Sequence, residues 1–255
     1  MKFVFITLFP EQIEAACAHS IVKRGLDAGL LTLECINPRD FSADRHRTVD
    51  DTPFGGGVGM VLKPEPVVEA IRLAKSRVPG APVIALSPGG ATFKQPLAEA
   101  WSKEYPGLIF VCGHYEGFDE RIYHWVDRKI SIGDFVLTGG ELPALLIMDA
   151  VSRFIPGVLG KLASAAEDSF STGLLEYPQY TRPVVYEGLK VPEVLRNGNH
   201  QLIARWRRKE ALKATLLLRP DLLPAAPDKQ DAKLLQEIRE ELAAGEKDAA
   251  LRNSL

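Results

Sequence analysis

Cysteine is scarce in this sequence, and its distribution argues against two common kinds of site. The three cysteines, Cys17, Cys35 and Cys112, lie far apart and form no C-x-x-C motif. Each stands in an apolar stretch, where a buried thiol is more common than a metal ligand or a disulfide partner. The sequence therefore predicts buried, free thiols.

Long apolar runs and a dominant charge are also missing. No stretch is long and apolar enough to span a bilayer. The apolar start, MKFVFITLFPEQ, stops at Pro10 and lacks a small-residue cleavage site, so it is typical of a buried first strand and not of a signal peptide. The formal net charge is −2, so any affinity for nucleic acid has to be local. These features predict a cytoplasmic protein with no membrane partner.

The common nucleotide-binding loops are absent, although glycine is concentrated in FGGGVGM at residues 54–60. Walker A requires Lys and then Ser or Thr after its second glycine, whereas Gly59 is followed by Met60 and Val61. The dinucleotide fingerprint, begun at Gly55, places Met60 where its last glycine belongs. The missing fingerprint argues against a NAD-dependent dehydrogenase, and the two failures together favour a glycine-rich turn with positive-φ residues.

What the sequence does contain is an alternation of strand-like and helical patterns, which predicts an α/β fold with a mostly parallel sheet. The expected strands are 2–8, 31–37, 82–86, 108–112 and 129–132, and the expected helices are 20–28, 65–78, 94–104, a short one near 119–126, and 141–154.

Small-residue loops follow three of these strands, at 87–90, 113–117 and 133–140. Any one of them is best explained as an ordinary tight turn. In an open α/β sheet, however, ligands bind beyond the carboxyl ends of the strands. The three loops together predict a site where bare backbone reaches an adenine or a ribose without a phosphate cradle.

The pattern changes after residue 155. A stretch rich in Gly, Ala and Ser carries no clear period and predicts an inter-domain linker. We expect a first domain at 1–157, a flexible linker at 158–175 and a small, mainly helical domain at 176–255.

One helix of the last domain is strongly basic. Gly198-Asn199 predicts its start, and residues 195–219 hold seven Lys or Arg against one acid, whereas residues 220–255 hold five basic against eight acidic residues. A charged helix face is usually just solvated, but a face of one sign suggests an anionic partner such as RNA. The candidate RNA-binding residues are Arg205, Arg208, Lys209 and Lys213. The charged stretch at 232–244 is expected to pack or to be solvated.

Several long motifs resemble the bacterial tRNA (guanine-N1)-methyltransferases. They run in order from Leu8-Phe9-Pro10 to about Pro220, and they include PRDFSADRHRTVDDTPFGGGVGM (38–60), VCGHYEGFDERI (111–122), SIGDFVLTGGELPA (131–144), SRFIPGVLG (152–160), EDSF (167–170), YTRP (180–183), GNH (198–200) and RWR (205–207).

The resemblance implies a SPOUT-class fold with a deep trefoil knot, one of the rare exceptions to unknotted topology. It also implies a homodimer whose active site is shared between subunits, tRNA as the partner, and dependence on Mg²⁺, for which the sequence defines no ligands. The implied activity is methylation of N1 of the guanosine at position 37, just 3′ of the anticodon, by S-adenosylmethionine.

By the same resemblance, S-adenosylmethionine lies between the three loops, with the 54–60 loop against the pocket. The implied cofactor-binding residues are Leu86, Ser87, Pro88, Gly113, Tyr115, Glu116, Ser131, Ile132, Gly133, Asp134, Phe135, Val136, Leu137, Gly139, Gly140 and Pro143. A Cβ at Gly113, Gly133, Gly139 or Gly140 is expected to obstruct the threading of the knot or the ligand.

The implied catalytic residues are Asp168, Arg153 and Glu116. N1 of guanine carries a proton at neutral pH, and Asp168 matches the family's general base, placed in a mobile loop that orders on RNA binding. Arg153 matches a residue that pairs with Asp168 or stabilises charge on guanine O6. The alternative roles are a helix cap for Asp168, a helix-dipole partner for Arg153 and a surface ion pair for Glu116.

The departures from the family pattern are mild: position 114 is His where Arg also occurs, and position 135 is Phe where Tyr is common. Two alternatives stay open. One is a SPOUT RNA methyltransferase for another base or for ribose, and the other is a catalytically inactive RNA-binding relative.

Overall fold

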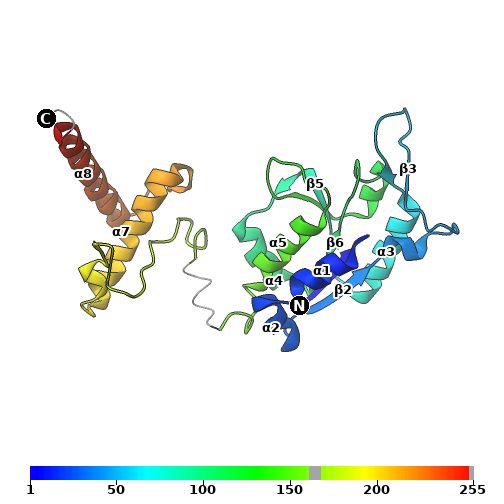
Figure 1. The fold of residues 1–255 in the computed structure, drawn as a ribbon, viewed down its shortest axis with the longest axis horizontal. Helices are drawn as coiled ribbons and strands as arrows, with labels where there is room; N and C mark the ends of the chain where they lie inside the picture. Colours follow the sequence, from blue (N-terminus) through cyan, green and yellow to red (C-terminus); the bar gives the residue numbers. More distant parts are fainter. Residues whose placement is uncertain (161–167, 253–255) are drawn as a thin grey trace. The chain divides into compact units, whose positions relative to one another are not determined.

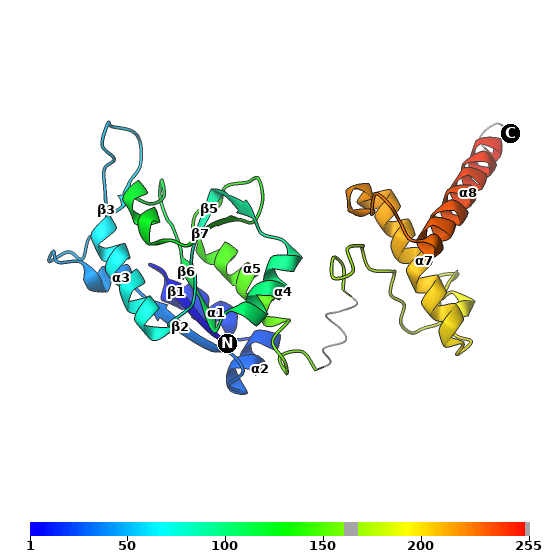
Figure 2. The same ribbon diagram turned by 180° about the vertical axis from the view of Figure 1, so that it is seen from behind.

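The structure, a computed structural model, describes residues 1–160 and 168–252, and of residues 245–252 only the helical backbone. The chain forms two compact units, Met1–Ala165 and Ala166–Leu255 (Figure 1). Figure 2 draws the same ribbon from behind. The expected linker at 158–175 spans the boundary of the units, and its residues 161–167 lie outside the described residues. The division into 1–157, 158–175 and 176–255 stays a prediction.

The first unit is built on a five-stranded sheet with the strand order β2-β1-β6-β5-β7. Every pairing in it is parallel, which confirms the predicted α/β fold with a mostly parallel sheet. The strands are β1 (Lys2–Ile6), β2 (Thr32–Ile36), β5 (Val83–Thr92), β6 (Gly107–Val111) and β7 (Arg128–Ser131).

Helices flank this sheet and, apart from α1, follow the order that the sequence alternation predicts. They are α1 (Pro10–Cys17), α2 (Ser20–Asp27), α3 (Pro64–Arg77), α4 (Gln95–Glu104) and α5 (Glu141–Ser152), with the 3₁₀ turns η1 (Pro38–Phe41) and η2 (Glu120–Trp125). A short antiparallel pair, β3 (Asp50–Asp51) and β4 (Val61–Leu62), closes the 54–60 loop.

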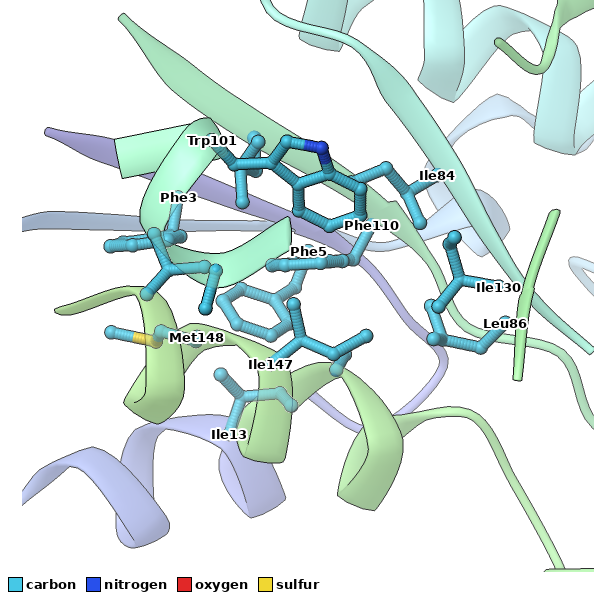
Figure 3. Close-up of a cluster of buried hydrophobic side chains, with 14 of the residues drawn as sticks. Phe3, Phe5, Ile13, Ile84, Leu86, Trp101, Phe110, Ile130, Ile147 and Met148 are labelled. Carbon is cyan, nitrogen blue, oxygen red and sulfur yellow. The ribbon is translucent and has the colours of Figure 1, made fainter. Parts of the chain in front are cut away.

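Apolar side chains cover both faces of the sheet, which explains why the strands are continuous apolar runs. On one face, Phe5 and Phe110 pack with ring centroids 5.2 Å apart, against α1, α4 and α5 (Figure 3). On the other face, Val4 and Ile109 pack against α3. The two-sided core fixes the strand ends, and with them the loops that follow.

Two expectations about local structure were wrong. The 87–90 stretch is not a loop, because β5 continues through it to Thr92 beside β7, with a register shift between Leu86 and Ala91. A Cβ at Gly90 would clash with the backbone of Ile130, so glycine permits this close approach. The sequence analysis also missed α1, in which Pro10 occupies the first turn, a position that tolerates proline.

The second unit is small and mainly helical. Its elements are the hairpin β8 (Val185–Tyr186) and β9 (Leu189–Lys190), the turns η3 (Glu193–Leu195) and η4 (Pro220–Leu222), and the helices α7 (His200–Leu218) and α8 (Lys229–Arg252). Asn199 caps α7 by accepting from the backbone N–H groups of Gln201 and Leu202, as its start signal predicts. A core that includes Leu212 and Ile238 joins the two helices.

The three cysteines are free thiols, as predicted. Cys17 and Cys112 are buried, whereas Cys35 is half-buried. Burial raises the pKa of the Cys35 thiol to about 12, and it also raises the pKa of Cys17. None of the helices among the described residues is long and apolar enough to cross a membrane.

Candidate functional site

A cleft of about 400 Å³ opens beside residues 86–88 of β5 and the carboxyl ends of β6 and β7. These segments lie next to one another because β5 stands between its parallel neighbours β6 and β7 in the sheet. Residues 86–88, 113–118, 130–133 and 135–140 line the cleft, together with Glu120, Tyr123 and, in the first turn of α5, Pro143. All of the residues predicted to hold the cofactor contribute to this lining except Asp134.

Other residues also line the cleft. These are His114, Gly117, Phe118, Glu120, Tyr123, Ile130 and Thr138. Most of them adjoin a predicted residue in sequence. Glu120 and Tyr123 belong to η2, and no pattern in the sequence indicated that this turn lies beside the loops.

Two of the cleft loops approach each other so closely that side chains are excluded. The backbone N–H of Gly140 donates to the carbonyl of Gly113 at 2.9 Å. A Cβ on Gly140 would lie 2.7 Å from the Cα of Cys112, and one on Gly139 would overlap the His114 ring. The two glycines therefore permit the 113–117 and 133–140 loops to meet.

No residue of the glycine-rich loop at 54–60 lines the cleft, but the C-terminal end of the loop contacts Glu116, which does. The backbone N–H of Glu116 donates to the Met60 carbonyl at 3.0 Å. Gly59 has φ = +103°, and a Cβ there would overlap the Glu116 carboxylate. At the tip, Phe54 and Val58 are almost fully exposed. The bare backbone thus serves a close approach to Glu116, while the tip projects into solvent.

A buried carboxylate supports the base of the cleft. Glu141, 1% exposed, is the first residue of α5. Its Oε1 accepts from the Thr7 hydroxyl at 2.6 Å, and its Oε2 lies 2.7 Å from Nε2 of His114. The position at a helix N-terminus favours a negative charge. The network joins the end of β1 to the 113–117 loop, and sequence reasoning missed it because position 141 looked like an ordinary first-turn acid.

Cys112 lies beside this carboxylate, directly before the 113–117 loop. Burial raises the pKa of its thiol well above the ordinary value, and the charge of Glu141 adds to the rise. The thiol therefore stays protonated at neutral pH and serves as packing.

The three candidate catalytic residues come from different parts of the chain. Glu116 lines it and is exposed. Arg153 caps the C-terminal end of α5 and is half-buried, outside the cleft lining. Asp168 belongs to the second unit, where its carbonyl accepts from the backbone N–H of Ser171. Both Arg153 and Asp168 have interaction partners.

The predicted mobile loop around Asp168 lies partly outside the described residues. From Asp168 onward, the described part is a hydrogen-bonded turn. The Phe170 N–H donates to the Leu174 carbonyl at 2.7 Å, and Leu174 is buried in the core of the second unit. The N–H of Glu176 donates to the Ser169 hydroxyl at 2.9 Å.

Most of the basic side chains predicted to bind RNA on α7 form ion pairs with α8. Arg205 pairs with Glu237 at 2.7 Å, and Arg208 with Asp231 at 2.5 Å. Lys209 of α7 lies 2.5 Å from Glu241, which belongs to α8, as Glu237 and Asp231 do. The hydrogen bonds to Asp231 raise the pKa of the Arg208 guanidinium. In the described part of the chain, Lys213 is the only one of the four predicted RNA-binding cations without an ion pair.

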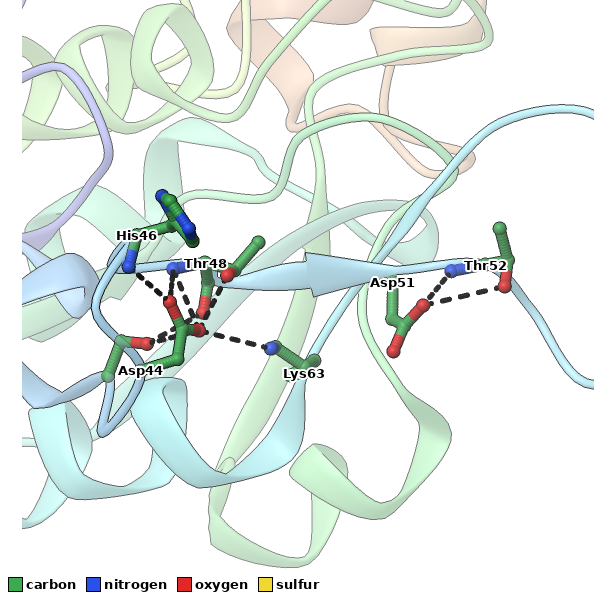
Figure 4. A network of polar contacts seen from close by, with 7 residues as sticks. Asp44, His46, Thr48, Asp51, Thr52 and Lys63 are labelled. Carbon is green, nitrogen blue, oxygen red and sulfur yellow. Dashed lines mark hydrogen bonds and ion pairs between the residues drawn. The ribbon is translucent and has the colours of Figure 1, made fainter.

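A further organised loop precedes β3 (Figure 4). The Asp44 carboxylate accepts from the Thr48 hydroxyl and backbone N–H, from the Ser42 hydroxyl and from the His46 N–H. These bonds, those from Thr48 above all, hold the pKa of Asp44 well below its usual range. Lys63 adds a more distant contact at 3.9 Å. The loop is therefore fixed although it is exposed.

The comparisons with known proteins agree on one family. The family model described as tRNA (Guanine-1)-methyltransferase TrmD matches residues 1–225. A tRNA (guanine-N(1)-)-methyltransferase of Dehalococcoides mccartyi is 55% identical over 241 residues, 93% of this chain and 97% of the relative. The proteins of the same name from Dictyoglomus turgidum and Bacillus subtilis are each 52% identical, over 95% and 94% of this chain and 98% and 100% of the relatives. The chain belongs to the tRNA (guanine-1)-methyltransferase family.

Proposed function

We propose that this protein transfers a methyl group from S-adenosylmethionine to N1 of the guanosine at position 37 of tRNA. The observation that carries the proposal is the cleft beside residues 86–88 of β5 and the ends of β6 and β7, which combines almost all of the family-matched cofactor residues in one place. The names of the relatives, which cover nearly the whole chain, support the same activity.

The cleft suits an adenosyl group. Leu86, Ile132 and Leu137 offer apolar surface for a flat ring, and the glycine-rich loops offer backbone N–H and C=O groups at its edge. The close approach of Gly140 to Cys112 leaves no space for a side chain there. When bound, the cofactor supplies an electrophilic methyl group on a sulfonium. The residues of the chain have to orient the guanine toward it and to remove a proton.

Asp168 is the proposed general base. The N1 lone pair forms the new bond to the methyl carbon as the bond from that carbon to sulfur breaks, and the N1 proton moves to the Asp168 carboxylate. Arg153 would stabilise negative charge on guanine O6. Glu116 lines the cleft and is the next carboxylate to consider.

A homodimer is the proposed assembly, with each site completed by Asp168 of the partner subunit. Exposed apolar side chains beside the cleft support this proposal. Val136 is 83% exposed, and Leu142 and Leu146 on the outer side of α5 are 55% and 49% exposed. A second copy that covers this surface would remove it from water.

We also propose the deep trefoil knot that the SPOUT class implies. The tight passage of the Gly139-Gly140 backbone past Cys112 and Gly113 supports it, as does that of Gly90 past Ile130. A magnesium requirement finds no support in the donor set. Residues 1–160 and 168–252 contain no group of three His, Cys, Asp or Glu side chains that could hold a metal ion, so no step is assigned to one.

Methyl transfer to unmodified tRNA transcripts tests the proposal. We expect one N1-methylated guanosine, mapped to position 37, and no product from a matched transcript with adenosine at that position. A product at another base or on ribose would favour a different RNA methyltransferase. Binding of tRNA with no methyl transfer would favour a catalytically inactive relative.

A further inference from the structure

The second unit has a pocket of its own, which the proposed reaction does not use. Its volume is about 180 Å³, less than half that of the cofactor cleft. The segment 177–180, Leu195 of η3, and Ile203, Trp206 and Arg207 of α7 line it. All of these residues belong to the second unit, so the pocket is complete within it.

Aromatic rings and a guanidinium group build the walls of this pocket. Ile203 and Trp206 lie one turn apart on the same side of α7. The Tyr180 ring is centred 6.2 Å from the Trp206 ring and tilted by 54°. The guanidinium carbon of Arg207 lies 4.8 Å from the centre of the Tyr177 ring. The pocket therefore presents π faces and a delocalised cation at once.

The rim of the pocket is open. Tyr180 is 48% exposed, and Pro178 and Gln179 are also exposed. A side chain that only served the core of this unit would be buried, as the Leu212 side chain is. The Gln179 amide stands at the rim, where its Nε2 donates to a Glu176 carboxylate oxygen at 2.5 Å. An amide offers both a donor and an acceptor, which suits the hydrogen-bonding edge of a base.

The charge around this pocket differs from the charge on the paired face of α7. Arg182 and Arg196 flank the pocket in sequence and are exposed. Within the described part of the second unit, neither forms an ion pair, whereas Arg205 and Arg208 are held by acids of α8. Guanidinium groups in this state remain available for phosphate oxygens. The positive charge of these two arginines is thus complementary to a polyanion.

We propose that this pocket binds one unstacked nucleobase of the tRNA, stacked against Tyr180 and Trp206. Proteins recognise the unpaired bases of RNA loops by stacking them on aromatic side chains and arginine planes. The small volume fits a single ring system, and Arg182 and Arg196 would contact the phosphates on either side. The inference rests on the proposed function, because tRNA is the RNA concerned, and it adds an RNA contact made by residues that the proposed methyl transfer does not use.

Replacement of Tyr180 tests the pocket, with a matched control in the same position. Tyr180→Ala removes the exposed ring, and Tyr180→Phe keeps it. We expect Tyr180→Ala to weaken binding of an unmodified tRNA transcript by roughly 5- to 150-fold, the size typical of one base–aromatic stack. Tyr180→Phe should bind within about twofold of the wild type by the same reasoning. S-adenosylmethionine binding should not change, which is the control for the first unit, and urea unfolding of the second unit should match the wild type, which is the control for its folding.

A fluorescent base locates the contact. Transcripts carry 2-aminopurine at one unpaired anticodon-loop position at a time. At one position, the wild type and Tyr180→Phe should quench the fluorescence on binding, and Tyr180→Ala should not. Unchanged affinity and quenching in Tyr180→Ala would overturn the base pocket, and so would an equal loss of binding to heparin, which has no bases. A change in oligomeric state instead would mean that a second copy occupies the pocket.

Failure of this inference is distinguishable from failure of the proposed function. If the wild type transfers no methyl group to any transcript, the proposed function fails whatever the Tyr180 variants do. If the wild type methylates position 37 and Tyr180→Ala binds tRNA normally, only the base pocket is wrong. If Tyr180→Ala does not fold, Tyr180→Leu and Gln179→Ala replace it and carry the same expectations.

Discussion

The two units of this chain are stabilised in different ways. In the first, apolar side chains cover both faces of a five-stranded sheet, and the buried carboxylate of Glu141 is held by Thr7 and His114. In the second, a small apolar core is supplemented by a row of ion pairs between α7 and α8. The first arrangement holds a cofactor-sized cleft in a fixed shape, whereas the second leaves basic and aromatic groups at the surface for a large anionic partner.

The largest effect should come from Asp168, the proposed general base. Asp168→Asn keeps the shape of the side chain and cannot accept the N1 proton. General-base assistance is typically worth about 10²–10⁴-fold, so the single-turnover rate of methyl transfer should fall by that amount. Binding of S-adenosylmethionine should change little, because Asp168 lies outside the cleft lining. Calorimetry measures the affinity of Asp168→Asn for S-adenosylmethionine and checks this expectation.

The pH dependence sharpens this prediction. Raising the pH toward the ionisation of guanine N1 itself should recover part of the rate in Asp168→Asn, because the base is then no longer needed. Methyl transfer at the wild-type rate would remove Asp168 from the mechanism and make Glu116 the next carboxylate to replace.

The cofactor cleft should be sensitive to single atoms. Gly140→Val would place a side chain against the Cys112 backbone, and overpacking of this kind costs about 1–3 kcal/mol or more. S-adenosylmethionine binding should fall by at least about tenfold, while circular dichroism shows a folded protein. Gly160→Val is the matched control, because a Cβ there meets nothing within 4 Å. Normal binding by a folded Gly140→Val protein would refute the pocket.

The ion pairs of the second unit should matter unequally. Asp231 is 4% exposed, so Arg208→Ala leaves a nearly buried carboxylate without its partner. We expect a loss of roughly 1–3 kcal/mol in the stability of the second unit, measured by urea unfolding. Arg205→Ala breaks a more exposed pair and should cost about 0–1 kcal/mol. Equal costs would mean that burial does not separate the two pairs.

Electrostatic pairing should also divide the predicted RNA-binding residues. Lys213 has no ion pair among the described residues, whereas Arg205 is held by Glu237. Lys213→Ala should therefore reduce the slope of log K against log salt for tRNA binding by about 0.7–0.9, the effect of one phosphate contact. Arg205→Ala should reduce it less. Unchanged slopes in both variants would show that this face does not contact phosphate.

The smallest effect tests whether the first unit also depends on charge. The depressed pKa of Asp44 means that its hydrogen bonds stabilise the fold above the pKa of an unfolded aspartate, about 3.9. This contribution is lost as the pH falls through the lower folded pKa. Asp44→Asn should lower Tm slightly at pH 7, and the difference from the wild type should shrink in acid. A difference that persists at the lowest pH would assign it to packing.

Sequence reasoning succeeded where local patterns decide the structure. The strand and helix alternation of the first unit follows from apolar runs and breakers, and the start of α7 follows from its Asn199 cap. It failed for 87–90, where the course of β5 depends on the distant Ile130 backbone. The pairing of Arg208 with Asp231 joins two helices and carries no local signal.

The candidate site divides in the same way. The positions of the three loops follow from the order of the strands, but the identity of the cofactor came from resemblance to a family. The Thr7–Glu141–His114 network could not be predicted, because it joins three separate segments of the chain. Thr7 and Glu141 alone are 134 residues apart in sequence. A buried acid and an exposed one look alike in a sequence.

The exposed tip of the 54–60 loop offers a chemical handle. The native thiols are poor nucleophiles at neutral pH, because burial raises the pKa of all three cysteines. A cysteine introduced by Val58→Cys would be exposed to solvent at the tip of this loop, whose last residue, Met60, contacts Glu116. A maleimide dye would therefore label this one position without removal of the native cysteines. Such a reporter would follow the occupancy of the cleft in the otherwise unaltered chain.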